Sequence, residues 1–337
     1  MNRSTTVRLG LALATTAVVL ATAIGAGAAG PELGESSPIL SNPNQQAITH
    51  GEQLAAATFG WKVKTIDANL SADKQVSDVD TLTNLGVKGL ITWTLDAGAA
   101  GAAYKRALDK GIPVVDYGST LNVTSTVFDE RGYKCTAGLK AAKYIASLVP
   151  KGKVLVIGGP PVPSITNYTN CFVKAAKTVG LDVVGKQDNV KDTAATAQPI
   201  VADLLTKNPD VNAIWTYNDP SSLGAGAAVR SAGKKAWVAG KSGGIVITGA
   251  NGSSDAAAGV RSGLITATWD PQPNMMGTIA VQLLAMHLKQ GKAISAMPKL
   301  IVIPIKAWDA RNIKTYVDPL KRKLKMAPIP AAWIAKK

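Results

Sequence analysis

Short apolar strands alternate with helices along most of this 337-residue chain. Residues 86–119, GVKGLITWTLDAGAAGAAYKRALDKGIPVVDYGS, hold two apolar strands around one helix, and later stretches repeat the pattern. Because a helix follows nearly every strand, the strands should run parallel in sheets covered on both faces. The elements are too many for one six-stranded unit. We therefore expect an α/β fold with two similar lobes.

The first 29 residues differ from the rest of the chain. Arg3 and Arg8 precede an apolar run over residues 9–24, and Ala26-Gly27-Ala28 offers a cleavage site of small residues. This pattern predicts a secretory signal peptide over residues 1–29, with an uncleaved membrane anchor as the alternative. No cysteine lies near the cleavage site, so the exported protein is expected to carry no lipid.

The chain contains two cysteines, Cys135 and Cys171. An even number of cysteines in an oxidising compartment permits one disulfide. Each cysteine lies near the start of a predicted helix in the same βα run, so packing could bring them together. Two separate buried thiols are the alternative.

Charge and histidine content argue against several classes of protein. The net charge is +15, but the lysines are scattered without the clustering of a nucleic-acid surface. The two histidines, His50 and His287, lie in separate predicted helices and make neither a metal site nor a catalytic triad.

The Gly224-x-Gly226 pair lies inside a predicted helix, whereas the glycines of a dinucleotide-binding fingerprint lie in the turn before the helix. We expect no enzyme activity, no metal and no cofactor.

Polar and aromatic residues close several strands just before the next helix. In open α/β sheets, ligands bind at the carboxyl ends of the strands. These strand ends therefore predict a pocket for a small polar molecule with an apolar face. The clearest pairs are Thr92-Trp93, Asp116-Tyr117, Tyr217-Asn218 and Trp269-Asp270.

Four segments in order resemble a known family. They are residues 41–61 (SNPNQQAITHGEQLAAATFGW), 86–119 with its GIPVV strand, 214–234 (IWTYNDPSSLGAGAAVRSAGK) and 265–284 (ITATWDPQPNMMGTIAVQLL). The family is the type I periplasmic solute-binding proteins, the ribose-binding-like receptors of sugar importers powered by ATP. The resemblance implies two Rossmann-like lobes with parallel sheets, joined by a three-strand hinge, with the ligand between them.

Domain boundaries follow from the same resemblance. Lobe one would comprise residues 31–128 and 272–298, lobe two residues 129–271 and 299–320, and residues 321–337 would form a basic, Pro-rich tail. The first strand, Glu32 to Ser36, carries an acid where the family is apolar. We therefore interpret it as a short edge strand.

The resemblance also implies a set of ligand-binding positions. These are Asn42, Asn44, Gln45, Trp93, Asp116, Tyr117, Thr166, Asn167, Asn218, Asn251, Trp269 and Asp270. Three charged contacts typical of ribose-type receptors are missing. Gly118-Ser119, or Asp116-Tyr117 in a shifted register, stands where the family has an Asp-Arg pair. An arginine is absent from the second-lobe helix, and Asn251 replaces an aspartate. These departures favour a neutral, partly apolar ligand.

Together these features predict an exported substrate-binding component of an ABC-type importer. It would close two lobes around a small sugar, polyol or related neutral solute and then dock, as a monomer, on a permease in the cytoplasmic membrane. A receptor that passes an autoinducer-type signal to a membrane sensor would share the same features and is the alternative.

Overall fold

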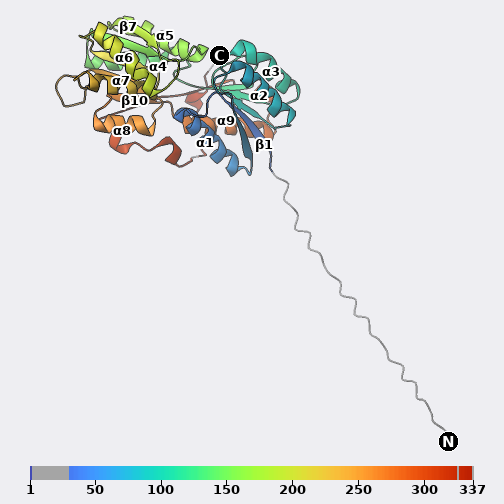
Figure 1. The fold of residues 1–337 in the computed structure, drawn as a ribbon. Helices are drawn as coiled ribbons and strands as arrows, with labels where there is room; N and C mark the ends of the chain where they lie inside the picture. Colours follow the sequence, from blue (N-terminus) through green and yellow to red (C-terminus); the bar gives the residue numbers. More distant parts are fainter. Residues whose placement is uncertain (2–29, 325, 336–337) are drawn as a thin grey trace.

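The computed structural model describes residue 1, residues 30–324 and residues 326–335. Two α/β lobes lie side by side (Figure 1), each built on one six-stranded sheet. The predicted fold class, two lobes with parallel sheets, is confirmed. The predicted signal peptide over residues 1–29 falls almost wholly outside the described residues.

Lobe one is built on the sheet β11-β5-β4-β3-β1-β2, in which every neighbouring pair is parallel. Helices α1 and α9 share one apolar core with one face of this sheet, and α2 and α3 share a second core with the other face. Its elements are β1 Glu32–Ser37, α1 Pro43–Thr58, β2 Lys62–Asp67, α2 Ala72–Asn84, β3 Leu90–Thr92, α3 Ala97–Asp109, β4 Val114–Asp116, β5 Ser125–Asp129, α9 Pro273–Leu288 and β11 Leu300–Ile303.

Lobe two is built on the sheet β12-β10-β9-β8-β6-β7, which is parallel except for its antiparallel edge strand β12. Helices α6 to α8 pack on one face, and α4 and α5 on the other. Its elements are α4 Thr136–Leu148, β6 Lys153–Gly158, α5 Pro163–Thr178, β7 Asp182–Asp188, α6 Ala194–Lys207, β8 Ala213–Thr216, α7 Asp219–Ser231, β9 Val246–Ala250, α8 Ser254–Ser262, β10 Ala267–Asp270 and β12 Lys306–Asp309.

The helices begin where the sequence supplies capping residues. Asn42 caps α1 by accepting a hydrogen bond from the Asn44 backbone N–H, and Pro43 occupies the first turn. Asn218 caps α7 in the same way, through the backbone N–H of Ser221. Each cap lies in the short connection after a strand, β1 for Asn42 and β8 for Asn218, so the first turns of these helices lie at the carboxyl edges of the sheets.

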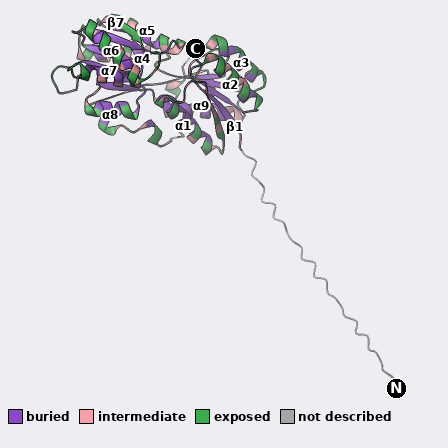
Figure 2. Cartoon of the chain, in the orientation of Figure 1, coloured by how far each residue is buried: buried purple, intermediate pink, exposed green. Residues whose placement is uncertain are grey.

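Burial follows the layered arrangement (Figure 2): the strands are buried and the outer helix faces are exposed. Adjacent strand residues supply opposite faces, as Leu90 and Ile91 of β3 do by entering the two different cores of lobe one. Trp215 of β8 is fully buried and stacks on Phe172 with ring centroids 4.4 Å apart. This tryptophan is therefore a core residue of lobe two.

Cys135 and Cys171 are joined by a disulfide, with their Cα atoms 5.0 Å apart. Cys135 precedes the first turn of α4 and Cys171 lies within α5. The bond thus ties together the two helices that cover one face of the lobe-two sheet.

Two strand assignments differ from the sequence expectation. β1 was expected at a sheet edge because of its acid, but it lies between β2 and β3. The Glu35 carboxylate is buried and accepts hydrogen bonds from Thr49 Oγ1 at 2.7 Å and Thr65 Oγ1 at 2.8 Å. These hydroxyls compensate the acid, which is why an interior strand tolerates it.

The second difference concerns the last lobe boundary. Leu300–Ile303 was expected in lobe two, but it forms β11 and pairs with β5 of lobe one. The chain therefore returns to lobe two only between β11 and β12. The chain passes between the sheets at three places: after β5, after β10 and after β11.

The C-terminal segment, which was expected to form a basic, Pro-rich tail, packs on lobe one. Leu324, Ile329 and Trp333 pack against the apolar core that α1 and α9 form with one face of the lobe-one sheet. Ile334 forms an antiparallel bridge with Ile301 of β11. The segment begins in lobe two and ends on lobe one, so it crosses from one lobe to the other again.

Among the described residues, no helix is both long enough and apolar enough to cross a membrane.

Candidate functional site

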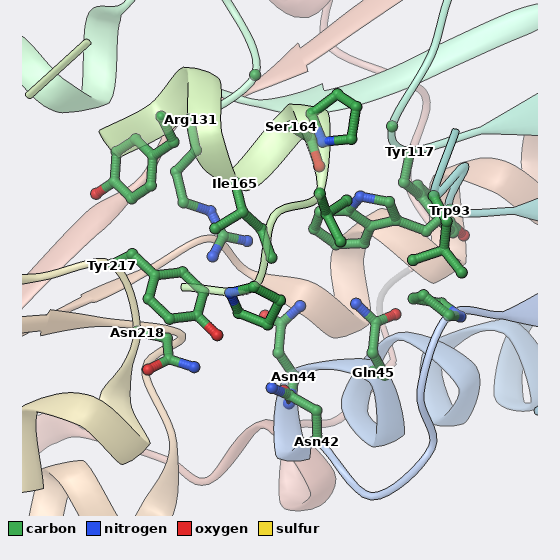
Figure 3. Close-up of a pocket in the computed structure, with 18 of the residues that line it drawn as sticks. Asn42, Asn44, Gln45, Trp93, Tyr117, Arg131, Ser164, Ile165, Tyr217 and Asn218 are labelled. Atoms are coloured by element: carbon green, nitrogen blue, oxygen red, sulfur yellow. Dashed lines mark hydrogen bonds between the residues drawn. The ribbon is translucent and has the colours of Figure 1, made fainter. Parts of the chain in front are cut away.

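A cavity of about 430 Å³ lies between the two lobes (Figure 3). Lobe one contributes the first turn of α1 and the ends of β3 and β4, and lobe two contributes the first turn of α5 and the end of β8. Its volume is within the range of about 300–1,000 Å³ typical of small-molecule sites. The cavity lies where the carboxyl edges of the two sheets face each other.

One direct hydrogen bond joins the lobes across this cavity. The Asn42 side-chain amide donates to the Asp192 carboxylate at 3.0 Å. On its own lobe, the same carboxylate accepts hydrogen bonds from the Tyr217 hydroxyl and the Asn218 amide. Burial raises the pKa of Asp192, and the three donors oppose that rise. Asp192 therefore gathers polar groups from both walls at one end of the cavity.

Arg131 is the cationic residue of the cavity wall in the described part of the chain. Its guanidinium forms an ion pair with Asp129 at 2.9 Å, and Nη1 donates to Asn251 Oδ1 at 3.0 Å. Figure 3 shows this guanidinium directed toward the side where Tyr217 and Asn218 lie. Because Asp129 neutralises it at close range, the arginine does not leave a free positive charge for an anion.

Three residues of the cavity wall each carry a buried side-chain oxygen with no hydrogen-bond partner among the described residues: Asn44 Oδ1, Ser164 Oγ and Tyr168 Oη. Asn44 and Tyr168 are nearly fully buried, but the Tyr168 ring packs edge-on against Trp215 in the lobe-two core. A buried polar atom left unpaired costs about 1–3 kcal/mol, which a bound molecule could recover. Asn44 is therefore the strongest candidate for a direct hydrogen bond to a ligand.

The cavity brings together eight of the twelve residues that the sequence indicated: Asn42, Asn44, Gln45, Trp93, Tyr117, Asn167, Asn218 and Asn251. The other four, Asp116, Thr166, Trp269 and Asp270, do not line it. Thr166 lies between the wall residues Ile165 and Asn167 on α5, but it is exposed and does not itself line the cavity.

Asp116 is fully buried and serves the local backbone instead. Its carboxylate accepts from the Thr92 hydroxyl at 2.8 Å and from the backbone N–H of Gly118 and Ser119. The carboxylate therefore shapes the turn after β4, while its neighbour Tyr117 reaches the cavity.

Trp269 and Asp270 are covered by the C-terminal part of the chain. Trp269 packs edge-on against Tyr144 at 5.7 Å between ring centroids, inside the lobe-two core. Asp270 accepts from Trp308 Nε1 of β12 at 2.9 Å and forms an ion pair with Arg322. The edge strand and the C-terminal segment thus occupy the contacts that the sequence assigned to a ligand.

Sequence reasoning missed Arg131, Tyr168 and Asp192 as wall residues. Arg131 follows the acid Asp129 by two residues, a spacing that allows the observed ion pair. Tyr168 lies next to Asn167 on α5, and Asp192 lies in the loop after β7 with a φ of 58°. No local pattern marks Asp192, because loop geometry and not strand periodicity brings it to the cavity.

A pair of buried carboxyl groups lies behind the lobe-one wall. Tyr117 lines the cavity and donates its hydroxyl to Glu52 at 2.7 Å. Burial, followed by the nearby charge of Glu35, raises the pKa of Glu52 well above its ordinary value. The Tyr117 hydroxyl is therefore already used, and this residue offers its ring rather than its oxygen to the cavity.

A two-lobed α/β chain with a polar-lined cavity between its lobes has the architecture of a solute-binding protein. The Periplasmic binding protein domain family matches residues 36–293, and the chain belongs to this family. It is a type I, ribose-binding-like member. The ribose import binding protein of Bacillus subtilis is 30% identical over 277 residues, which cover 81% of this chain and 86% of the relative.

Other relatives extend this comparison. The D-allose-binding periplasmic protein of Escherichia coli is 26% identical over 275 residues, covering 76% of this chain and 84% of that protein. The structure of a myo-inositol binding protein from Caulobacter matches with a TM-score of 0.73 at 23% identity, covering 84% and 95% of the two chains. A D-arabinose complex of a solute-binding protein from Burkholderia graminis gives 0.75 at 19% identity, covering 86% and 98%. These structures share the fold.

Proposed function

We propose that this chain is the exported substrate-binding component of an ABC-type importer and that it closes its lobes around a small, neutral, oxygenated solute. The cavity between the lobes carries this proposal, because its wall comes from both of them. A ligand that contacts both walls binds the closed form better than the open form, and this differential affinity drives closure. The Asn42–Asp192 hydrogen bond would form only on closure.

The same proposal covers export and partners. A cleaved signal over residues 1–29 would deliver a non-lipidated monomer to the cell envelope, where the closed form would dock on a permease. The three passages between the sheets would form the hinge.

A thermal-shift screen of the purified protein against sugars, polyols, organic acids and aromatic compounds tests the proposal. A ligand at one hundred times its dissociation constant adds about 2.7 kcal/mol, which corresponds to a shift of roughly 5–10 °C. At least one neutral hydroxylated compound should produce such a shift. If only acids stabilise the protein, the neutral site is refuted.

Asn44→Ala tests whether the compounds that stabilise the protein bind in this cavity. It removes the unpaired Oδ1 but leaves the backbone N–H that Asn42 caps, so affinity should fall by about fivefold or more without unfolding. Thr166→Ala is the matched control, because Thr166 is exposed and lies outside the cavity. Equal binding by both variants would remove Asn44 from the site.

A further inference from the structure

The cavity wall is mixed: a polar side holds Tyr217, Asn218 and Arg131, and an apolar surface forms much of the rest. Figure 3 shows these three residues toward one side, with Ile165 beside Arg131, and Trp93, Tyr117 and Gln45 toward the other. The apolar surface comes from both lobes. It includes Ile39, Leu70, Trp93, Leu95, Val162 and Ile165.

On the lobe-one side of this apolar surface, the Trp93 indole leaves no room for a polar side chain at position 118 that could contact the ligand. A Cβ atom on Gly118 would lie 2.6 Å from Trp93 Cδ1 and 2.8 Å from the Thr94 backbone oxygen. The indole therefore occupies the space that a side chain at position 118 would need. The Ser119 hydroxyl is also unavailable, because it accepts a hydrogen bond from the Leu121 backbone N–H at 3.0 Å.

The polar side offers neutral hydrogen-bonding groups rather than free charge. Asp129 pairs with Arg131, and Asp192 is surrounded by three donors. Asn44 Oδ1 is a buried oxygen without a hydrogen-bond partner among the described residues. A ligand hydroxyl suits it, because a hydroxyl can donate to an amide oxygen.

Cavity size adds an independent argument. A volume of about 430 Å³ lies within the range of cavities that hold drug-sized ligands. A free monosaccharide has fewer non-hydrogen atoms than such a ligand. A sugar placed against the polar side would leave the apolar surface facing water, which is unfavourable in proportion to its area.

We propose that the preferred ligand is a neutral hydroxylated compound that carries an apolar substituent, of the class of small aryl or alkyl glycosides. Its hydroxylated part contacts Asn44, and its apolar part lies against Trp93 and Val162. This inference rests on the proposed function, because it specifies the solute that the same cavity receives.

Isothermal titration calorimetry with matched pairs of ligands tests the assignment. The probes are phenyl and methyl β-glycosides of glucose, galactose, xylose and arabinose, together with free D-ribose, D-allose and myo-inositol. For at least one sugar, the phenyl glycoside should bind about tenfold or more tightly than the methyl glycoside, because phenyl buries more apolar surface. It should also bind more tightly than every free sugar or polyol.

Variants then assign the effect to the wall. Trp93→Ala should bring the phenyl-to-methyl affinity ratio close to one, whereas Trp93→Phe should keep most of it. Val162→Thr, a nearly isosteric change on the opposite lobe, should lower the ratio even if Trp93→Ala fails to fold. Asn44→Ala should weaken phenyl and methyl glycosides by the same factor and leave their ratio unchanged.

The outcomes separate the two proposals. If a free sugar or polyol binds as tightly as every phenyl glycoside, the inference is overturned and the proposed function stands. The inference is also overturned if the ratio survives in both Trp93→Ala and Val162→Thr. If no neutral compound of the panel or of the wider screen binds, the proposed function fails, and the inference fails with it.

Discussion

The stability of lobe two should depend on pH through one buried carboxyl group, that of Asp219. This residue lies in the first turn of α7 and is fully buried. Its carboxylate accepts from Thr268 Oγ1 at 2.5 Å and from the Ser253 backbone N–H at 2.8 Å. Burial nevertheless raises its pKa from an ordinary 3.8 to about 6.

The direction of the effect follows from proton linkage. Between pH 3.8 and about 6, the folded protein keeps the Asp219 proton while the unfolded chain has lost it. The stability contributed by the protonated group is fully present below pH 3.8 and is lost as the pH rises through about 6. At about 1.4 kcal/mol per pKa unit, the loss by pH 7.5 is about 3 kcal/mol.

Asp219→Asn isolates this contribution. The amide cannot ionise, and its oxygen can still accept from Thr268. Its NH₂ group cannot accept from the Ser253 N–H, which costs about 1–3 kcal/mol at every pH. That constant cost cancels when the difference in unfolding free energy between wild type and variant is compared across pH. The difference should move by about 3 kcal/mol in favour of the variant between pH 3.5 and pH 7.5.

Urea unfolding at constant ionic strength, followed by tryptophan fluorescence at pH 3.5, 5, 6 and 7.5, measures this difference. Burial also raises the pKa values of Glu52 and Asp116, but both proteins contain these groups, so their contributions cancel. Asp73→Asn, at an exposed position in the first turn of α2, controls for loss of one negative charge. A difference for Asp219→Asn that stays constant across the four pH values would refute the reasoning.

Three further changes probe the disulfide, the C-terminal segment and the lobe-one wall. Replacing Cys135 and Cys171 together by Ser should lower the unfolding free energy by about 4 kcal/mol, from their separation of 36 residues, and should abolish the effect of dithiothreitol in a denaturant titration. Arg322→Ala leaves the buried Asp270 carboxylate without its cation and should lower the unfolding free energy by about 3 kcal/mol in the same assay. An unchanged unfolding free energy would mean that the ion pair does not form. Gly118→Ala should cost about 1–3 kcal/mol by crowding Trp93 Cδ1, and in a Trp93→Ala background calorimetric unfolding should show a smaller cost.

Much of the fold could be predicted because βα repeats encode it locally. Short apolar runs mark buried strands such as β3, and capping residues such as Asn42 and Asn218 mark helix starts. The position of β1 inside its sheet could not be predicted in this way. The order of strands depends on pairing across the chain, and the acid at Glu35 suggested an edge until its two hydroxyl partners were seen.

The candidate site could be predicted where a strand end and a helix cap coincide, as at Asn218. The prediction failed at Trp269 and Asp270, because β12 and the C-terminal segment cover the end of β10. Whether a strand end is open or covered is decided by elements far away in sequence. Asp192 was missed for the converse reason, since a loop brings it to the cavity.

The loss of charged contacts in lobe one also has a structural meaning that position-by-position comparison does not provide. Sequence alone treats the tryptophan at 93 and the glycine at 118 as separate departures from the family pattern. The structure makes them one exchange, because the indole fills the volume that a side chain at 118 would require. A chain with an acid at position 118 would have to shift or lose the Trp93 indole. A polar ligand contact from position 118 and an apolar wall at Trp93 therefore exclude each other. A substitution at either position should change ligand preference, because it changes the space available at the other.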